Sequence, residues 1–196
     1  MQLRTIVFDL DGVIRHYDRG QEAEIERRHG LGPGQLLELA YGGSLGYDLM
    51  CGRIDPDTFV TRFGADVGPI EAARELVGMQ AELDRAMVEL IEALRDCVTV
   101  ALLTNGTTNT RNELAAHGLS DAFDHVFNSA EIGLAKPTTE VYDHVRAELR
   151  VDGAHVLFID DKPTNIDGAV SAGWHGHHFR DQVTLRRELD RHGVPG

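Results

Sequence analysis

Two aspartates separated by a single residue, Asp9 and Asp11, follow the apolar run from Thr5 to Phe8. Such a run is typical of a buried strand, and Gly12 indicates a turn immediately after it. A turn needs one aspartate for its backbone, whereas two neighbouring carboxylates repel each other unless they share a cation. The pair therefore predicts a metal-assisted reaction at the end of a strand. The alternative is an aspartate-rich turn with no catalytic role.

Further polar side chains follow the other apolar runs of the chain. Because the carboxyl ends of parallel strands meet at one edge of a sheet, we expect these side chains to lie in one crevice with Asp9. A hydroxyl, an amide, an amine and several carboxylates at one place could bind and transfer an anionic group. The residues are Thr104 and Asn105 after the run 98–103, Lys136 after the run 126–127, and Asp160 and Asp161 after the run 156–159.

The elements that must position these side chains alternate between strands and helices. Short runs of Val, Ile, Leu and Phe predict buried strands, and the helices between them end near glycines. This order predicts a doubly wound α/β domain, with a mainly parallel sheet and helices on both faces. The predicted strands span 5–8, 98–103, 126–127, 156–159 and 175–179, and the predicted helices span 107–117, 138–149 and 165–172.

The pattern changes between the first two strands, where helical stretches occur without a convincing strand from Ile14 to Leu94. Asp55 and Pro56 supply a helix N-cap and a proline at the first helical position. We therefore predict a core domain of residues 1–14 and 95–196 and a small, all-helical domain of residues 15–94 inserted after the first strand. Its helices are predicted over 21–29, 35–40, 57–63 and 70–94.

The composition limits the partners of the protein. Asp and Glu number 32 against 19 Lys and Arg, which gives a net charge of −13 and argues against nucleic acid or an anionic membrane as partner. An anionic substrate then needs a locally positive site, made by a metal, a lysine or backbone N–H groups. With only Cys51 and Cys97, no signal segment and no apolar run near the ~20 residues that span a bilayer, we expect a cytoplasmic protein.

In its motifs and their order the chain resembles the haloacid dehalogenase-like hydrolase superfamily over nearly its whole length. The resemblance implies a Rossmann-like core, and the helical insertion resembles the small cap domain of one subclass. The segment Gly52-Arg53-Ile54-Asp55 sits where that cap often carries a similar turn. The matching motifs are Asp9-Leu10-Asp11-Gly12-Val13, Thr104-Asn105, Lys136 and Asp160-Asp161, in the order of the family's four motifs.

The resemblance implies a Mg²⁺-dependent phosphatase that acts on a small phosphorylated metabolite. Asp9 would attack phosphorus and form an aspartyl-phosphate, while Asp11 would serve as general acid and then general base. Mg²⁺ would be held by the Asp9 carboxylate, the Asp11 backbone carbonyl and Asp161, with Asp160 just outside and holding a metal-bound water.

The resemblance also implies how the phosphate group is bound. Thr104 and the backbone of Asn105 would hold phosphate oxygens. Lys136 would neutralise Asp9 and stabilise the charge that develops on the transferring group. These groups would make the site locally positive within an acidic protein.

Asp11 distinguishes two chemistries within the superfamily. Dehalogenases displace halide from carbon without a metal, and members that resemble them generally lack an aspartate two residues after the nucleophile. Asp11 and the Asp160-Asp161 pair therefore favour phosphate chemistry over a 2-haloacid dehalogenase. Two alternatives stay open: a phosphomutase that passes the phosphoryl group from Asp9 to a second hydroxyl, and a binding protein that keeps the fold without turnover.

Two further segments carry weaker signals. His175 and His177 alternate on a predicted strand and could share a face as metal ligands, but without a Cys or acidic partner beside them a polar edge strand is the preferred interpretation. The glycine-rich segment from Tyr41 to Tyr47 lies in the insertion. It either faces the leaving group and sets selectivity, for example through Tyr47, or simply connects two cap helices.

Overall fold

Five parallel strands form the central sheet of the protein in a computed structural model that describes residues 2–195. The first strand lies in the middle, and the chain adds strands on one side of it before it adds the rest on the other. The order therefore reverses between β1 and β6, which is where ligands bind in such sheets. From edge to edge the strands are β5 (His125–Asn128), β4 (Thr99–Thr104), β1 (Thr5–Phe8), β6 (Val156–Asp160) and β7 (His175–His178).

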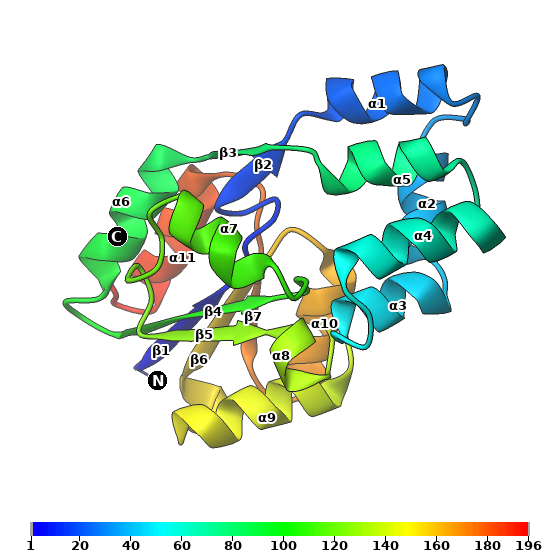
Figure 1. Cartoon of the computed structure of the whole chain (residues 1–196). Helices are drawn as coiled ribbons and strands as arrows, with labels where there is room; N and C mark the ends of the chain where they lie inside the picture. The colour runs from blue at the N-terminus through cyan, green and yellow to red at the C-terminus, as the bar shows by residue number, and fades with distance from the viewer. Residues whose placement is uncertain (1, 196) are drawn as a thin grey trace.

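Helices cover both faces of this sheet (Figure 1). Along β1, Ile6 and Phe8 belong to one buried hydrophobic cluster and Val7 to another, because alternate residues of a strand point to opposite faces. The predicted doubly wound, Rossmann-like α/β fold is therefore confirmed. The first face carries α6 (Arg85–Leu94), α7 (Thr110–Ala116) and α11 (Gln182–Arg191), and the second carries α8 (Ser129–Ile132), α9 (Thr139–Leu149) and α10 (Pro163–Ser171).

Each predicted strand of the sheet is present, and its ends lie within one residue of the prediction. The three predicted core helices are present as α7, α9 and α10, whereas α8 and α11 were not predicted. A signal for α11 existed, because Asp181 caps its first turn and Leu185 and Leu189 lie one turn apart in the core. A short 3₁₀ helix, Gly153–His155, precedes β6. Within residues 2–195, no helix has the length and apolar character that crossing a membrane requires.

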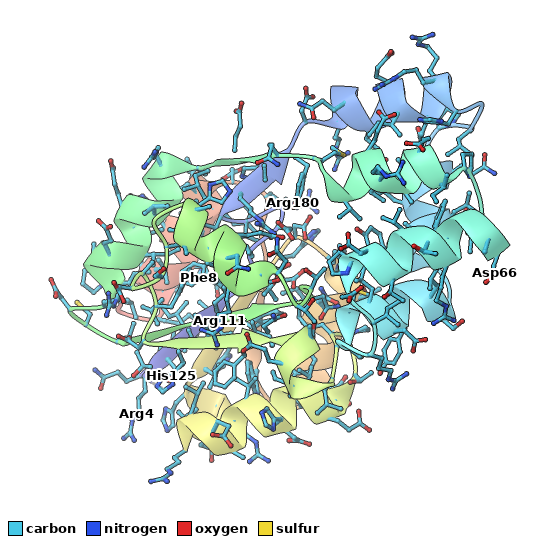
Figure 2. All side chains as sticks on the ribbon, in the orientation of Figure 1. Arg4, Phe8, Asp66, Arg111, His125 and Arg180 are labelled. Carbon is cyan, nitrogen blue, oxygen red and sulfur yellow. The ribbon has the colours of Figure 1, made fainter. Side chains whose placement is uncertain are left out.

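A bundle of short helices stands beyond the end of the sheet opposite to Arg4 and His125 (Figures 1 and 2). We call these helices the cap, because they follow β1 in the chain as the predicted insertion does. Their apolar side chains form a cluster of their own, separate from the two clusters of the sheet. The cap helices are α1 (Arg19–Arg28), α2 (Gln35–Tyr41), α3 (Ser44–Met50), α4 (Pro56–Asp66) and α5 (Ile70–Val77).

The prediction of one helix over 70–94, with no strand between Ile14 and Leu94, is wrong. The helix ends at Val77, and β3 (Ala81–Leu83) follows and pairs antiparallel with β2 (Arg15–Tyr17). Asp84 then caps α6 by accepting a hydrogen bond from the Met87 amide. The sequence did not reveal this break, because α5 and α6 are both amphipathic and their apolar residues have the same helical spacing. The two helices nevertheless pack in different hydrophobic cores.

The position of α6 bears on the domain boundary predicted at residue 94. Leu90 and Ile91 of α6 belong to the same buried cluster as Phe8 of the central strand, whereas Leu76 of α5 belongs to the cap cluster. We therefore propose that the cap domain ends before β3 and that α6 is part of the core domain.

The cap contacts the core domain at the N-terminus of α8. The Ser129 hydroxyl donates a hydrogen bond of 2.5 Å to the backbone carbonyl of Met50, at the end of α3. Gly52 follows with a φ of +66°, and its Cα lies so close to the Ala130 carbonyl that a β-carbon would overlap the oxygen. The turn at Gly52 is therefore a docking point between cap and core.

Candidate active site

Asp9 lies directly beyond β1 and is buried, with 5% of its surface exposed. Its amide donates to the Ile159 carbonyl of β6 at 2.8 Å, so the central strand pair continues up to Asp9 itself. The amide of Leu10 donates to Asp9 Oδ1 at 2.7 Å. The carboxylate is thus fixed at the point where the strand order reverses.

A buried lysine joins two of the predicted site carboxylates. Lys136 Nζ lies 2.8 Å from Asp9 Oδ1 and 2.7 Å from Asp160 Oδ2, and its side chain is only 1% exposed. Burial opposes the charge of Lys136, but the two carboxylates outweigh it and raise the lysine pKa. Burial raises the pKa of Asp9 to about 7 against the pull of Lys136, and the charges of Asp160 and Asp11 add to the rise. One ammonium group shared by two buried carboxylates leaves an excess of negative charge.

The two adjacent aspartates after β6 differ in how well their oxygens are satisfied. Asp160 is fully buried, and besides Lys136 it accepts hydrogen bonds from the Lys162 amide at 2.8 Å and from the Asn165 side chain at 2.9 and 3.0 Å. Asp161 Oδ1 is buried too, yet within residues 2–195 it has no hydrogen-bond partner. Burial, followed by the charge of Asp160, raises the pKa of Asp161.

These carboxylates fit a hard divalent cation. One oxygen each of Asp9, Asp160 and Asp161 lies within 4.8 Å of the others, and an all-oxygen set with spare negative charge suits Mg²⁺. The unpartnered oxygen of Asp161 makes it the natural ligand, while the oxygens of Asp160 are already occupied by donors. The division of ligands between these residues stays a prediction.

The side chain of Asn105, in the loop after β4, joins this loop to the segment after β5 that carries Lys136. Asn105 donates from Nδ2 to the Lys136 carbonyl at 2.8 Å, and its Oδ1 accepts from the Lys136 amide at 2.8 Å. Thr104, at the end of β4, is 1% exposed. Sequence reasoning used only the backbone of Asn105 and missed that its side chain holds the backbone of Lys136.

The Asp11 side chain pairs with a different cation from the Lys136 that contacts Asp9. It forms an ion pair with Arg15 instead, and it is 38% exposed. Arg15 in turn contacts Glu113 of α7 at 2.8 Å. Sequence reasoning missed both partners, because no motif marks Arg15 and Glu113 lies 98 residues further along the chain.

The weaker sequence signals resolve differently. Strand β7 is an edge strand, as preferred, and His175 uses Nε2 to contact the Ala154 carbonyl at 3.1 Å. Within residues 2–195, the aspartates near Lys136 are the only group of three or more His, Cys, Asp or Glu side chains close enough together to hold a metal ion. A polar edge strand stays the preferred interpretation of His175 and His177.

The glycine-rich segment of the cap is mostly helical, and only Gly42 and Gly43 lie between α2 and α3. Tyr41 stacks on Phe59 with ring centroids 6.5 Å apart. Tyr41 is 41% exposed. The influence of Tyr47 on selectivity stays a prediction.

The family model for haloacid dehalogenase-like hydrolases matches residues 3–173. The chain belongs to this family. It is 32% identical over 145 residues to the sesquiterpene phosphatase astK of Aspergillus oryzae, covering 70% of this chain and 74% of the relative. It is also 32% identical over 191 residues to the phosphatase MT3486 of Mycobacterium tuberculosis, covering 88% and 85%. The resemblance that the motifs predicted is therefore confirmed.

Solved structures of family members share the fold of the haloacid dehalogenase-like chain described above. A HAD-like family hydrolase from Porphyromonas gingivalis superposes with a TM-score of 0.78 at 24% identity, covering 97% of this chain and 99% of that one. A HAD family enzyme from Bacteroides thetaiotaomicron, in complex with magnesium and inorganic phosphate, superposes with a TM-score of 0.73 at 19% identity, covering 93% and 98%. At these identities the likeness concerns the fold.

Proposed function

We propose that this protein is a Mg²⁺-dependent phosphatase that hydrolyses a small-molecule phosphomonoester through an aspartyl-phosphate on Asp9. The observation that carries the proposal is the buried contact of Lys136 with both Asp9 and Asp160. It puts an anionic nucleophile beside a cation that can stabilise a transferring phosphoryl group. The phosphatases among the relatives and the magnesium and phosphate bound by the B. thetaiotaomicron enzyme support the same reaction.

The reaction proceeds in two steps. In the first, an oxygen of Asp9 attacks phosphorus, the bond from phosphorus to the leaving oxygen breaks, and Asp11 donates a proton to that oxygen. In the second, Asp11 removes a proton from water, the water oxygen attacks phosphorus, and the bond from phosphorus to Asp9 breaks. The products are an alcohol, inorganic phosphate and the free Asp9 carboxylate.

Contacts around Asp9 support its role as nucleophile. Leu10 and Lys136 both contact Oδ1, which leaves Oδ2 to attack phosphorus. Thr104 and the backbone of Asn105 hold the phosphate oxygens, and the ammonium group of Lys136 stabilises the charge that develops on them. These interactions strengthen as charge moves onto the phosphate, so they favour the transition state.

The carboxylates of Asp9 and Asp161 and the backbone carbonyl of Asp11 would hold Mg²⁺, with Asp160 just outside the ligand set. When bound, Mg²⁺ would offset the excess of carboxylate charge and polarise the phosphate. Asp160 orients Lys136 and Asn165 by accepting hydrogen bonds from both side chains.

Hydrolysis of p-nitrophenyl phosphate tests this proposal, with Mg²⁺ or EDTA and with wild type beside Asp9→Ala. Asp66→Ala is the matched control, since Asp66 is exposed at the outer end of α4 (Figure 2). We expect wild type and Asp66→Ala to turn over only with Mg²⁺ and Asp9→Ala to be inactive. Turnover in EDTA, or near-normal turnover by Asp9→Ala, would contradict the proposal. Transfer to an added hydroxyl compound in place of water would favour the phosphomutase.

A further inference from the structure

The side chain of Arg15 carries a buried positive charge that has no role in the two proposed reaction steps. Arg15 is the first residue of β2, and its side chain is 6% exposed. Its Nε donates a hydrogen bond to Asp11 Oδ1, and its Nη2 donates one to Asp11 Oδ2 at 3.3 Å. The guanidinium therefore contacts both carboxylate oxygens. A two-pronged contact of this kind fixes the direction of a carboxylate as well as binding it.

The backbone of Arg15 closes the same turn that carries Asp11. Its amide donates to the Leu10 carbonyl at 3.0 Å, and its carbonyl accepts from the Gly12 amide at 2.8 Å. Arg15 therefore contacts the Asp11 carboxylate through its side chain and both chain neighbours of Asp11, Leu10 and Gly12, through its main chain. These contacts place the Asp11 carboxylate relative to Asp9, which directly follows β1.

Glu113 holds Arg15 from the opposite side. Arg15 Nη1 donates to Glu113 Oε2 at 2.8 Å, and the Tyr17 ring centroid lies 5.6 Å from the guanidinium carbon. The other oxygen of Glu113 accepts a 3.4 Å hydrogen bond from Asn109. Burial opposes the charge of Arg15, but Asp11 and Glu113 outweigh it and raise the pKa of Arg15. The guanidinium therefore stays charged and has little freedom to turn.

The two aspartates of the first motif are thus served by two different cations, Asp9 by Lys136 and Asp11 by Arg15. We propose that Arg15 is a positioning residue that holds the Asp11 carboxylate in line for proton transfer, and that Glu113 keeps Arg15 in place. This inference rests on the proposed function, in which Asp11 donates a proton to the leaving oxygen. A misplacement of about 1 Å in such a group can cost about 100-fold in rate.

Two substrates of similar shape separate positioning from a structural effect. Phenyl phosphate has a poorer leaving group than p-nitrophenyl phosphate, so it depends more on a proton from Asp11. We expect Arg15→Met to lower kcat for phenyl phosphate about 10- to 100-fold and for p-nitrophenyl phosphate much less, with little change in KM. Glu113→Gln should act in the same direction and more weakly, because it leaves Arg15 on Asp11.

A double-mutant cycle with Asp11→Asn completes the test. In that background Arg15→Met should cause no further loss with phenyl phosphate, because the group it positions is gone. Arg111→Met is the control: Arg111 lies on α7 like Glu113, is 54% exposed and pairs with Glu131, so the ratio of the two rates should not change (Figure 2).

The outcomes separate the inference from the proposed function. Equal losses on both substrates for Arg15→Met and Glu113→Gln, or an undiminished loss in the Asp11→Asn background, would overturn the role of Arg15 while wild type stays active. If Arg15→Met fails to fold, Glu113→Gln decides, since the Glu113 side chain is 32% exposed and tolerates exchange more easily. A wild type without Mg²⁺-dependent turnover of either ester would overturn the proposed function and this inference with it.

Discussion

Gly12 packs so closely against Asp161 that a β-carbon on Gly12 would overlap the Oδ2 oxygen of the carboxylate. The glycine also has a φ of +87°, which other residues rarely adopt. We expect Gly12→Ala to push Asp161 away from Asp9 and to lower the affinity for Mg²⁺ about tenfold or more. Loss of supporting groups around a metal site has an effect of this size. A titration of turnover against Mg²⁺ measures this effect.

Gly30→Ala is the control for Gly12→Ala. Gly30 also has a positive φ, +69°, but space around it is open, so alanine there adds backbone strain without a collision. The Mg²⁺ dependence of Gly30→Ala should match wild type. If both variants lose Mg²⁺ affinity equally, close packing against Asp161 is not the cause.

The raised pKa of Asp9 makes a prediction about stability and pH. The pKa in the folded state is about 7 against an ordinary value of 3.8, so folding favours the protonated form. The stabilisation is complete below the ordinary value and is lost as pH rises through about 7. In EDTA, the Tm of Asp9→Asn relative to that of wild type should therefore rise as the pH is raised from about 5 to about 8. A difference in Tm that does not vary with pH would contradict this prediction.

Removal of the shared lysine should destabilise the protein strongly. Lys136→Met leaves Asp9 and Asp160 buried without a cation, and breaking a buried ion pair in this way costs about 3–5 kcal/mol. Unfolding in urea measures the loss. Lys162→Met is the control, because the Lys162 side chain is exposed. It should change the free energy of unfolding by less than about 0.5 kcal/mol. Similar losses in both variants would argue against an ion pair of this strength.

The side chain of Asn105 should matter for both stability and turnover. Asn105→Ala removes two hydrogen bonds to the backbone of Lys136, which we expect to cost about 1–3 kcal/mol and to lower kcat because the lysine loses its support. Asn112→Ala removes one exposed hydrogen bond, to Asn109, and serves as control in urea unfolding and in turnover. A kcat equal to wild type in Asn105→Ala would show that Lys136 does not need this support.

Docking of the cap can be tested at Gly52. An alanine there would collide with the Ala130 carbonyl, so we expect Gly52→Ala to displace the cap and to lower turnover severalfold. Gly34→Ala in the same domain has a similar φ, +77°, and open space, so it carries the backbone strain of about 1–2 kcal/mol alone. If turnover falls equally in both, strain rather than docking explains the loss.

Local patterns in the sequence were sufficient for the sheet and for the residues at its carboxyl edge. A buried parallel strand such as β1 is a continuous apolar run, and the polar residue that ends it is visible in the same window. Once the alternation of strands and helices predicts a doubly wound sheet, topology alone brings Asp9, Lys136 and Asp160 to one edge. For this reason the position of the site needed no knowledge of contacts.

Only the tertiary structure decided which cation serves which carboxylate and which core each amphipathic helix joins. Arg15 meets Glu113 across 98 residues, and no periodicity within either segment encodes that contact. The helices α5 and α6 carry the same kind of apolar stripe, yet one packs in the cap and the other on the sheet. An apolar stripe predicts that one face of a helix is buried. The element that buries it depends on the packing of the whole chain.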